Sequence, residues 1–263
     1  MKVGSLFTGY GGLDLAVGGD MSWYSEIDSA ACTILKSHYS DVVNIGDITE
    51  VDWSAVEPVD VLTGGYPCQP FSTAGKRKGE SDERHLWPYV REAIRALEPR
   101  VVVLENVRGH LTLGFSTVLG EVADLGYSAR WGVVRASDAG APHQRARLFI
   151  VAHPKGTDWG VKKPESLAAT AGGATESRER GGENTWGTFT AAIKEWERHT
   201  GRICPTPWVE DKVNPLFVEW MMGLPEGWVT GHGLSASEEL RMLGNGVVPQ
   251  QAELALELLE VYS

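Results

Sequence analysis

Short apolar runs alternate with segments of helical spacing through the first 153 residues of the chain. Apolar runs of a few residues predict strands, and apolar residues three and four apart predict helices. The predicted strands are Val3–Phe7, Ser22–Glu26, Val59–Thr63, Val101–Leu104, Ser128–Val134 and Arg147–Ala152. The predicted helices are Leu13–Val17, Ala30–Tyr39, Leu86–Leu97 and Thr117–Leu125. Strands and helices in this order indicate βαβ units, an α/β fold and a mainly parallel sheet.

The pattern changes after residue 153. Residues 154–187 are rich in Gly, Thr, Glu and Ser, which predicts loops. A helix over Phe189–His199 and a Pro-rich turn at Cys204–Pro207 follow. We therefore expect a main domain over 1–153 and a small domain over 154–236.

The C-terminal segment, residues 237–263, has two predicted parts. From Ser237 a loop is expected that contains Leu243–Gly246. A helix over Pro249–Tyr262 comes next, and its apolar spacing is that of a helix packed on a sheet. This segment is therefore expected to return to the main domain.

Composition bounds the class of protein. A chain of 263 residues can hold one large α/β domain or a domain with a small companion. Three cysteines imply no disulfide framework and fit a reducing compartment. Cys32 and Cys204 have no CxxC or histidine cluster beside them, so we expect both to be structural and no metal to bind. The start of the chain lacks the apolar core of a signal peptide, and no run of about 18 apolar residues occurs, so a cytoplasmic protein is expected.

The formal net charge of −11 weighs against a nucleic-acid partner. Binding to a polyanion needs only a local basic patch, however, because net charge is a sum over the whole surface. Lys76–Lys78, Arg84, Arg145 and Arg147 are the cations that can form one.

A glycine-rich turn follows the first predicted strand and precedes the first predicted helix. Glycine lets the backbone turn sharply and approach a ligand, and a helix amino terminus offers free N–H donors. Glu26 ends the second strand, where a carboxylate can accept both hydroxyls of a ribose, and Asp47 can accept from an adenine amino group. The alternative interpretation is a tight turn with two solvated acids. The turn departs from the GxGxxG pattern, which favours an adenosine cofactor other than a dinucleotide. Its residues are Phe7, Thr8, Gly9, Tyr10, Gly11 and Gly12.

Four further side chains are predicted at the same edge of the sheet. Pro67-Cys68-Gln69 follows the strand that ends at Thr63, and Glu105 follows Val101–Leu104. Arg145 and Arg147, two apart, share one face if the last strand begins there. Taken singly, these residues are a buried small thiol, a turn acid and two solvated arginines. Taken together, a thiol, a carboxyl and a guanidinium make a site for nucleophilic attack on a polar heterocycle.

In this order the motifs resemble the C5-cytosine DNA methyltransferases that use S-adenosylmethionine. The resemblance covers residues 5–153 and about 214–254, and extends to compact phage and prophage members. It implies a Rossmann-like methyltransferase sheet with helices on both faces, plus a small irregular target-recognition domain. The motifs that carry it are Phe7–Gly12, Glu26, Asp47, Pro67-Cys68-Gln69, Glu105-Asn106-Val107, Arg145-Ala146-Arg147, Asn214–Pro225 and Gly244–Pro249.

The resemblance implies a role for each catalytic candidate. Cys68 would add to C6 of a cytosine flipped out of the duplex, while protonated Glu105 binds N3 and the exocyclic amine. Arg147 would hold the O2 carbonyl, and Arg145 would support the thiolate and the anionic intermediate. The loop Ser72–Arg84 resembles the mobile loop that closes over DNA in this family.

The resemblance also implies a cofactor pocket. Phe7, Tyr10 and Gly12 would surround the methionine and adenosine parts, with Thr8, Gly9, Gly11 and Pro67 beside them. Glu26 would bind the ribose, Asp47 the adenine amino group, and Ile27 and Ile48 the two faces of the adenine. Asn245 and Gly246 would complete the pocket. Gly246 is a departure, because serine is common at that position in the family, and His143 with Gln144 replaces a family glutamine.

Other interpretations stay open at this stage. Double-stranded DNA is the expected partner; a cognate restriction endonuclease is left open by the sequence, and the family mostly works as monomers. A tRNA-modifying branch shares the catalytic residues, but its Cys-Phe-Thr tripeptide does not follow Glu105-Asn106-Val107 here. A catalytically inactive DNA-binding relative is disfavoured because Cys68, Glu105 and Arg147 are all present.

Overall fold

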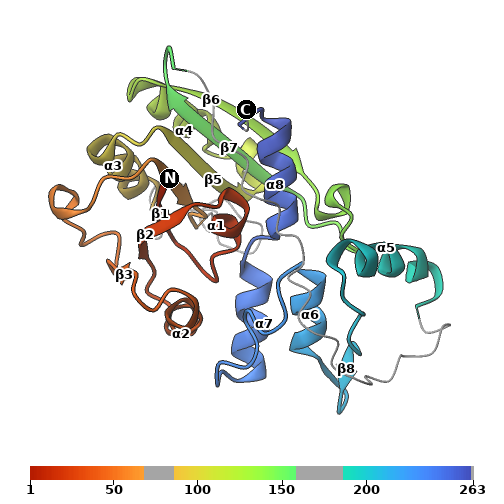
Figure 1. The fold of residues 1–263 in the computed structure, drawn as a ribbon. Coiled ribbons are helices and arrows are strands. Elements are labelled where there is room, and N and C mark those ends of the chain that lie inside the picture. Colours follow the sequence, from red (N-terminus) through yellow and green to blue (C-terminus); the bar gives the residue numbers. More distant parts are fainter. Residues whose placement is uncertain (68–85, 158–185, 262–263) are drawn as a thin grey trace.

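A computed structural model of the chain describes residues 1–67, 86–157 and 186–261 (Figure 1). Cys68 and the predicted closing loop Ser72–Arg84 lie outside the described residues. Most of the predicted glycine-rich stretch 154–187 lies outside them as well.

The centre of the fold is a sheet of strand order β3-β2-β1-β4-β5-β7-β6 in the described part of the chain. Neighbouring strands are parallel from β3 through β2, β1 and β4 to β5. Strand β7 is antiparallel to both of its neighbours, β5 and β6. The predicted mainly parallel sheet is therefore confirmed. The strands are β1 (Lys2–Leu6), β2 (Asp20–Ser25), β3 (Val43–Asn44), β4 (Val61–Gly64), β5 (Val101–Val107), β6 (Tyr127–Val134) and β7 (Arg147–Pro154).

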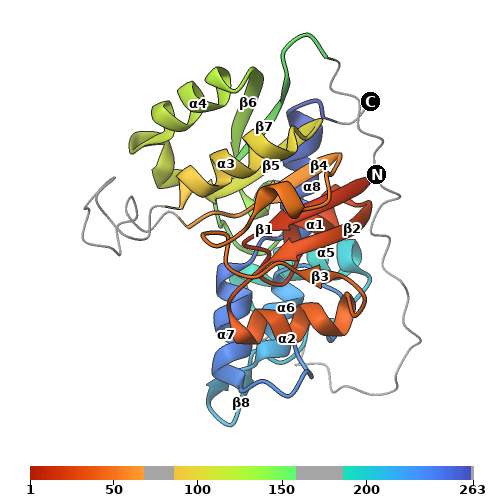
Figure 2. The same cartoon turned by 90° about the vertical axis from the view of Figure 1, so that its left-hand side faces the viewer.

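Helices cover both faces of this sheet, as expected for strands whose side chains are buried on both sides. Helices α3 (Trp87–Leu97) and α4 (Phe115–Asp124) pack on one face through a core that includes Val90, Val118 and Leu104. Helices α1 (Gly12–Val17) and α8 (Pro249–Leu258) pack on the other through a core that includes Leu13 and Leu256. Figure 2 shows α3 and α4 on one side of the sheet and α8 on the other.

A third core lies beyond the carboxyl edge of the sheet. Helices α5 (Thr190–Thr200) and α6 (Pro215–Met221) bury Trp196 and Trp220 completely in this core, which also takes in Ile34 of α2 (Ser29–His38). A short hairpin of β8 (Trp208–Val209) and β9 (Lys212–Val213) precedes α6. These elements occupy the lower part of Figure 1. The predicted division at residues 153 and 236 stays a prediction.

The loop predicted from Ser237 is wrong, because the structure has helix α7 there, over Ala236–Asn245. A capping box starts it: the Ser235 hydroxyl accepts from the Glu238 N–H, and the Glu238 carboxylate accepts from the Ser235 N–H at 2.9 Å. Gly244 and Asn245, which were predicted to lie in the loop, form the last turn of this helix. The predicted helix to Tyr262 ends earlier, at Leu258, because Glu260 takes a left-handed conformation (φ 55°).

In the part of the chain that the structure describes, no helix combines the length and apolar character needed to cross a membrane.

Candidate active site

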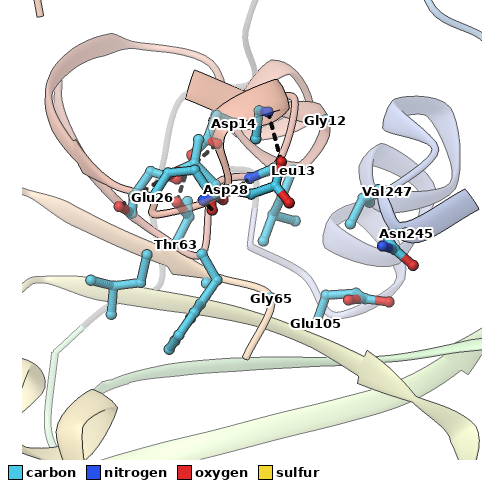
Figure 3. A pocket seen from close by; sticks show the side chains of 18 of the residues that line it. Gly12, Leu13, Asp14, Glu26, Asp28, Thr63, Gly65, Glu105, Asn245 and Val247 are labelled. Carbon is cyan, nitrogen blue, oxygen red and sulfur yellow. Dashed lines mark hydrogen bonds between the residues drawn. The ribbon is translucent and has the colours of Figure 1, made fainter. Parts of the chain in front are cut away.

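A cavity of about 210 Å³ opens at the carboxyl edge of β1 and β4 (Figure 3). Parallel α/β sheets build their ligand sites at this edge because the loops after neighbouring strands converge there. Figure 3 shows Asp14, Glu26 and Asp28 at the upper left of the pocket, and Glu105 and Asn245 at the lower right. The cavity is lined by Ser5, Leu6, Phe7, Thr8, Gly9, Gly12, Leu13, Asp14, Glu26, Asp28, Ala31, Thr63, Gly64, Gly65, Glu105, Arg241, Met242, Asn245, Gly246 and Val247.

The glycine-rich turn between β1 and α1 needs its glycines for two different reasons. Gly9 and Gly11 have positive φ angles of 58° and 80°, and residues other than glycine rarely adopt such angles. At Gly12 the limit is space, since a Cβ there would lie 2.3 Å from the carbonyl oxygen of Val247. The turn therefore lets the C-terminal segment come into direct contact with the start of α1.

Tyr10 joins the same two parts of the chain. Its ring is buried, and its hydroxyl donates to the carbonyl oxygen of Val247 at 2.7 Å. A Cβ on Gly246 would lie 1.9 Å from a ring carbon of Tyr10. Gly246, which stands where serine is common in the resembled family, is therefore the residue that leaves room for the Tyr10 ring.

Glu26 lies directly after β2 and lines the cavity. One of its carboxylate oxygens accepts from the N–H groups of Ile27 and Asp28, and the other accepts from Gly9 N–H at 2.8 Å. This carboxylate is therefore held rigidly beside the glycine-rich turn. It still has lone pairs that can accept from the hydroxyls of a bound ligand.

The structure brings seven of the thirteen predicted cofactor residues together. Phe7, Thr8, Gly9, Gly12, Glu26, Asn245 and Gly246 line the cavity. Six others, all within the described residues, are not among its lining residues: Tyr10, Gly11, Ile27, Asp47, Ile48 and Pro67.

Three of these six residues were predicted to contact the adenine, and each lies away from the cavity lining. Ile27 is 71% exposed, whereas Ile48 is buried in the core beneath α3. Asp47 uses one carboxylate oxygen to accept from the N–H and hydroxyl of Thr49. The predicted adenine contacts of these three residues stay predictions.

Glu105 and Arg147 form an ion pair where β5 and β7 run side by side. The Glu105 carboxylate is 3.0 Å from Nε of Arg147, and Glu105 is only 9% exposed. Burial raises the pKa of Glu105 above its ordinary value, and the positive charges of Arg147 and Arg145 oppose that rise. A carboxyl with a raised pKa at the wall of a cavity can keep a proton to donate. The predicted role of Glu105 toward cytosine stays a prediction.

Asn106 ties this strand to the segment that leads to Cys68. Its side-chain amide donates to the carbonyl oxygen of Tyr66 at 3.1 Å, and Tyr66 is two residues before Cys68. The Tyr66 hydroxyl is also 2.8 Å from Nε2 of the buried His110. The backbone before Cys68 is therefore fixed to the strand that carries Glu105.

Arg145 and Arg147 do not share a strand face. Strand β7 begins at Arg147, and Arg145 precedes it with φ 28°. The Arg145 guanidinium turns to the end of α7, where it donates to the carbonyl oxygens of Gly244 and Gly246. Its predicted role toward the thiolate stays a prediction.

Sequence reasoning missed the polar side chains at the back of the cavity. Asp14 accepts from the hydroxyls of Ser5 (2.9 Å) and Thr63 (2.5 Å). Burial raises its pKa to about 6, although both hydrogen bonds favour the ionised form. The signal was a lone acid in the otherwise apolar run Leu13–Val17, opposite a polar residue in each of two buried strands.

Two further residues were missed at the rim. Asp28 caps the amino end of α2, accepting from the N–H groups of Ala30 and Ala31. Arg241 of α7 forms an ion pair with the Asp28 carboxylate, and both residues line the cavity. This pair connects α7 to α2 across the cavity rim.

The fold and the site together define an α/β protein with an acidic pocket at the carboxyl edge of its sheet. A family model for C-5 cytosine-specific DNA methylases matches residues 1–179. The chain belongs to this family.

Relatives with known names agree with that assignment. Type II methyltransferase M.NaeI of Lentzea aerocolonigenes is 42% identical over 137 residues, which is 48% of this chain and 33% of that protein. M.DsaV of Dactylococcopsis salina is 30% identical over 216 residues, or 77% of this chain and 59% of that protein. The match spans about a third of the length of the first curated relatives.

Among solved structures, a DNMT2 variant from Spodoptera frugiperda is similar with a TM-score of 0.69. The alignment covers 98% of this chain and 99% of that chain at 17% identity. At this level of identity the likeness shows the fold, and it agrees with the layers described above.

Proposed function

We propose that this protein transfers a methyl group from S-adenosylmethionine to carbon 5 of cytosine in double-stranded DNA, with Cys68 as the nucleophile. The observation that carries the proposal is the ion pair of the buried Glu105 with Arg147, because Glu105 also lines the cavity beside the glycine-rich turn. Family membership supports the same reaction.

The charge of the cavity suits the cofactor. S-adenosylmethionine carries a sulfonium and an ammonium group, and the cavity is lined by the carboxyl groups of Asp14, Glu26 and Asp28. Glu26, which is held beside the glycine-rich turn, would accept from the ribose hydroxyls, and Asn245 would contact the cofactor from the opposite wall. When bound, the cofactor supplies the methyl group that cytosine receives. The predicted contacts of Tyr10, Gly11, Ile27, Asp47, Ile48 and Pro67 belong to this proposal.

The residues of the chain account for the activation of the base. The Cys68 sulfur forms a bond to carbon 6, and the electron pair of the 5,6 double bond becomes available at carbon 5. Glu105 donates a hydrogen bond or proton to N3, and the rise in its pKa that burial causes favours the protonated form that this step needs. Arg147 orients Glu105 and donates a hydrogen bond to the O2 carbonyl of cytosine. The positive charge of Arg145 adds to the electrostatic potential at the site. After methylation, carbon 5 loses its proton to solvent, the carbon–sulfur bond breaks as the Cys68 thiolate leaves, and the 5,6 double bond forms again. N3 then returns its proton to the Glu105 carboxylate.

Double-stranded DNA is the proposed substrate, although a stacked cytosine cannot reach a side chain inside a pocket. The base must therefore be rotated out of the duplex, at a cost of a few kcal/mol. We assign recognition of the target sequence to residues 154–236. We also propose that the protein acts as a monomer. This part of the proposal holds whether or not a cognate restriction endonuclease accompanies it.

The test is transfer of a tritiated methyl group from S-adenosylmethionine to mixed-sequence duplex DNA and, separately, to tRNA. We expect labelled 5-methylcytosine in the duplex. Cys68→Ser should abolish it, whereas the matched control Cys204→Ser should not, because Cys204 packs against the third core and is not among the residues that line the cavity.

Two results would replace the proposal. Label that enters only tRNA would assign the protein to RNA modification. No label in either nucleic acid, with S-adenosylhomocysteine still bound, would point to an inactive DNA-binding relative.

A further inference from the structure

We propose that Arg145 is a positioning residue that holds the end of α7, and with it Asn245, in place at the cofactor cavity. The inference rests on the proposed cofactor site and concerns how this chain builds it. It gives Arg145 a task other than contact with the cytosine.

The first observation is the destination of the Arg145 side chain. Its NH1 donates to the carbonyl oxygen of Gly244 at 2.9 Å, and its NH2 donates to that of Gly246. These carbonyls belong to the last turn of α7 and the residue after it, where helix carbonyls lack partners within the helix. A guanidinium there satisfies them and interacts favourably with the helix dipole.

The second observation is that the held segment is the cavity wall. Asn245, Gly246 and Val247 all line the cavity. The Tyr10 hydroxyl donates to the next carbonyl, that of Val247, at 2.7 Å. Two side chains from distant parts of the chain therefore hold three carbonyls around Asn245, which itself stays directed to the cavity.

The third observation is that Arg145 is itself held in an uncommon conformation. Its φ of 28° is one that residues other than glycine rarely adopt, and such a conformation persists where its surroundings impose it. The Gln251 side chain of α8 donates to the Arg145 carbonyl at 2.7 Å and to the Val134 carbonyl at 2.8 Å. Gln251 is completely buried, so this support is well fixed.

These contacts make a continuous connection from α8 through Arg145 to the cavity wall. If Arg145 acts by positioning, its loss should weaken cofactor binding, because Asn245 would have to be ordered at the moment of binding. A residue that acts on the cytosine would instead lower the rate at saturating cofactor and leave cofactor affinity unchanged.

The experiment measures the Kd of S-adenosylhomocysteine by titration calorimetry, and KM and kcat for S-adenosylmethionine with duplex DNA. The variants are Arg145→Met and Arg145→Lys. The matched control is Arg130→Met, because Arg130 also donates to a carbonyl at a helix end, that of Leu259 after α8. Arg130 lies on β6, away from the cavity lining.

We expect Arg145→Met to raise Kd and KM about tenfold or more, with a smaller change in kcat, and Arg130→Met to leave both constants at the wild-type values. Arg145→Lys should recover part of the affinity, and it carries the test if the Met variant does not fold. Wild-type Kd in both Arg145 variants with a reduced kcat would overturn the inference and leave the cofactor site intact. A wild-type protein that binds no S-adenosylhomocysteine would instead remove the proposed function and this inference together.

Discussion

At the scale of single residues, the contact between Tyr10 and Gly246 explains a departure from the family pattern. Gly246 has an ordinary φ of −77°, so its backbone would accept other residues. Space is the limit, because the buried Tyr10 ring occupies the volume of a Cβ. The large Tyr10 side chain and the absence of a side chain at Gly246 are therefore complementary.

We predict that Gly246→Ser destabilises the protein by about 1–3 kcal/mol, the usual cost of adding atoms to a filled core. The same change in a Tyr10→Leu background should cost less, because the shorter side chain leaves room. Urea unfolding of the four proteins of this double-mutant cycle checks the prediction. Equal costs of the serine in both backgrounds would contradict it.

Asp14 gives a prediction about pH. Its pKa is about 6 in the folded protein and about 4 for an ordinary unfolded aspartate, so the folded state holds the proton more tightly. This contribution to stability is fully present below about pH 4 and is lost as the pH rises through 6. Asp14→Asn cannot ionise, and hydroxyls of Ser5 and Thr63 can turn to accept from its amide.

The free energy of unfolding of Asp14→Asn should therefore exceed that of the wild type at pH 7, by up to roughly 3 kcal/mol. The difference should shrink as the pH falls from 6 to 4. Urea unfolding at several pH values, with no cofactor present, measures it. Parallel stability curves for the two proteins over this range would show that Asp14 is not the group responsible.

At the scale of secondary-structure elements, two helices next to the cavity start with side-chain caps. Helix α7 is capped by the Ser235–Glu238 capping box, and α2 is capped by the Asp28 carboxylate. Both helices carry cavity residues, and Asp28 and Arg241 join them at the rim. The capping residues therefore stabilise the site as well as the helices.

We predict that Ser235→Ala destabilises the protein by about 1 kcal/mol, since it removes the acceptor for the Glu238 N–H. Ser237→Ala is the control, because Ser237 is an exposed residue of the same first turn. Thermal unfolding followed by circular dichroism compares the two variants. A loss that is equal for both would argue that the cap itself contributes nothing.

At the scale of the whole molecule, residues 214–232 connect the third core to the glycine-rich turn. The completely buried Glu219 accepts from the N–H groups of Gly227, Val229 and Thr230 and so shapes this loop. Trp228 of the same loop donates from its indole nitrogen to the Tyr10 carbonyl at 2.8 Å. The proposed recognition region and the proposed cofactor site are therefore in direct contact.

We predict that Trp228→Phe lowers the free energy of unfolding by about 1–3 kcal/mol, because the Tyr10 carbonyl loses its donor and the stack on His38 is reduced. The matched control is Trp208→Phe, since Trp208 is 61% exposed and should tolerate the change. Urea unfolding followed by far-ultraviolet circular dichroism avoids the altered fluorescence. Equal stability of the two variants would contradict the role assigned to Trp228.

The parts of this protein that the sequence determined are those governed by local pattern. Strands buried on both faces are continuous apolar runs, so β1, β4, β5 and β7 could be located from the sequence, and Glu105 of β5 with them. The sequence also located β2, and with it Glu26 directly after that strand. The glycine-rich turn between a strand and a helix was also a local signal, and it marked the cavity because few residues other than glycine fit there. The capping box of α7 was a local signal too, but the glycine and asparagine of its last turn concealed the helix.

Only the tertiary structure decided which side chains meet. Asp14 lies beside Ser5 and Thr63, and Arg145 beside Gly244 and Gly246, because segments far apart in the sequence pack together. The raised pKa of Asp14 has the same origin, since burial depends on everything that surrounds a group. Hydrophobic periodicity reports the face a residue occupies, but it carries no information on the distant residue across from it.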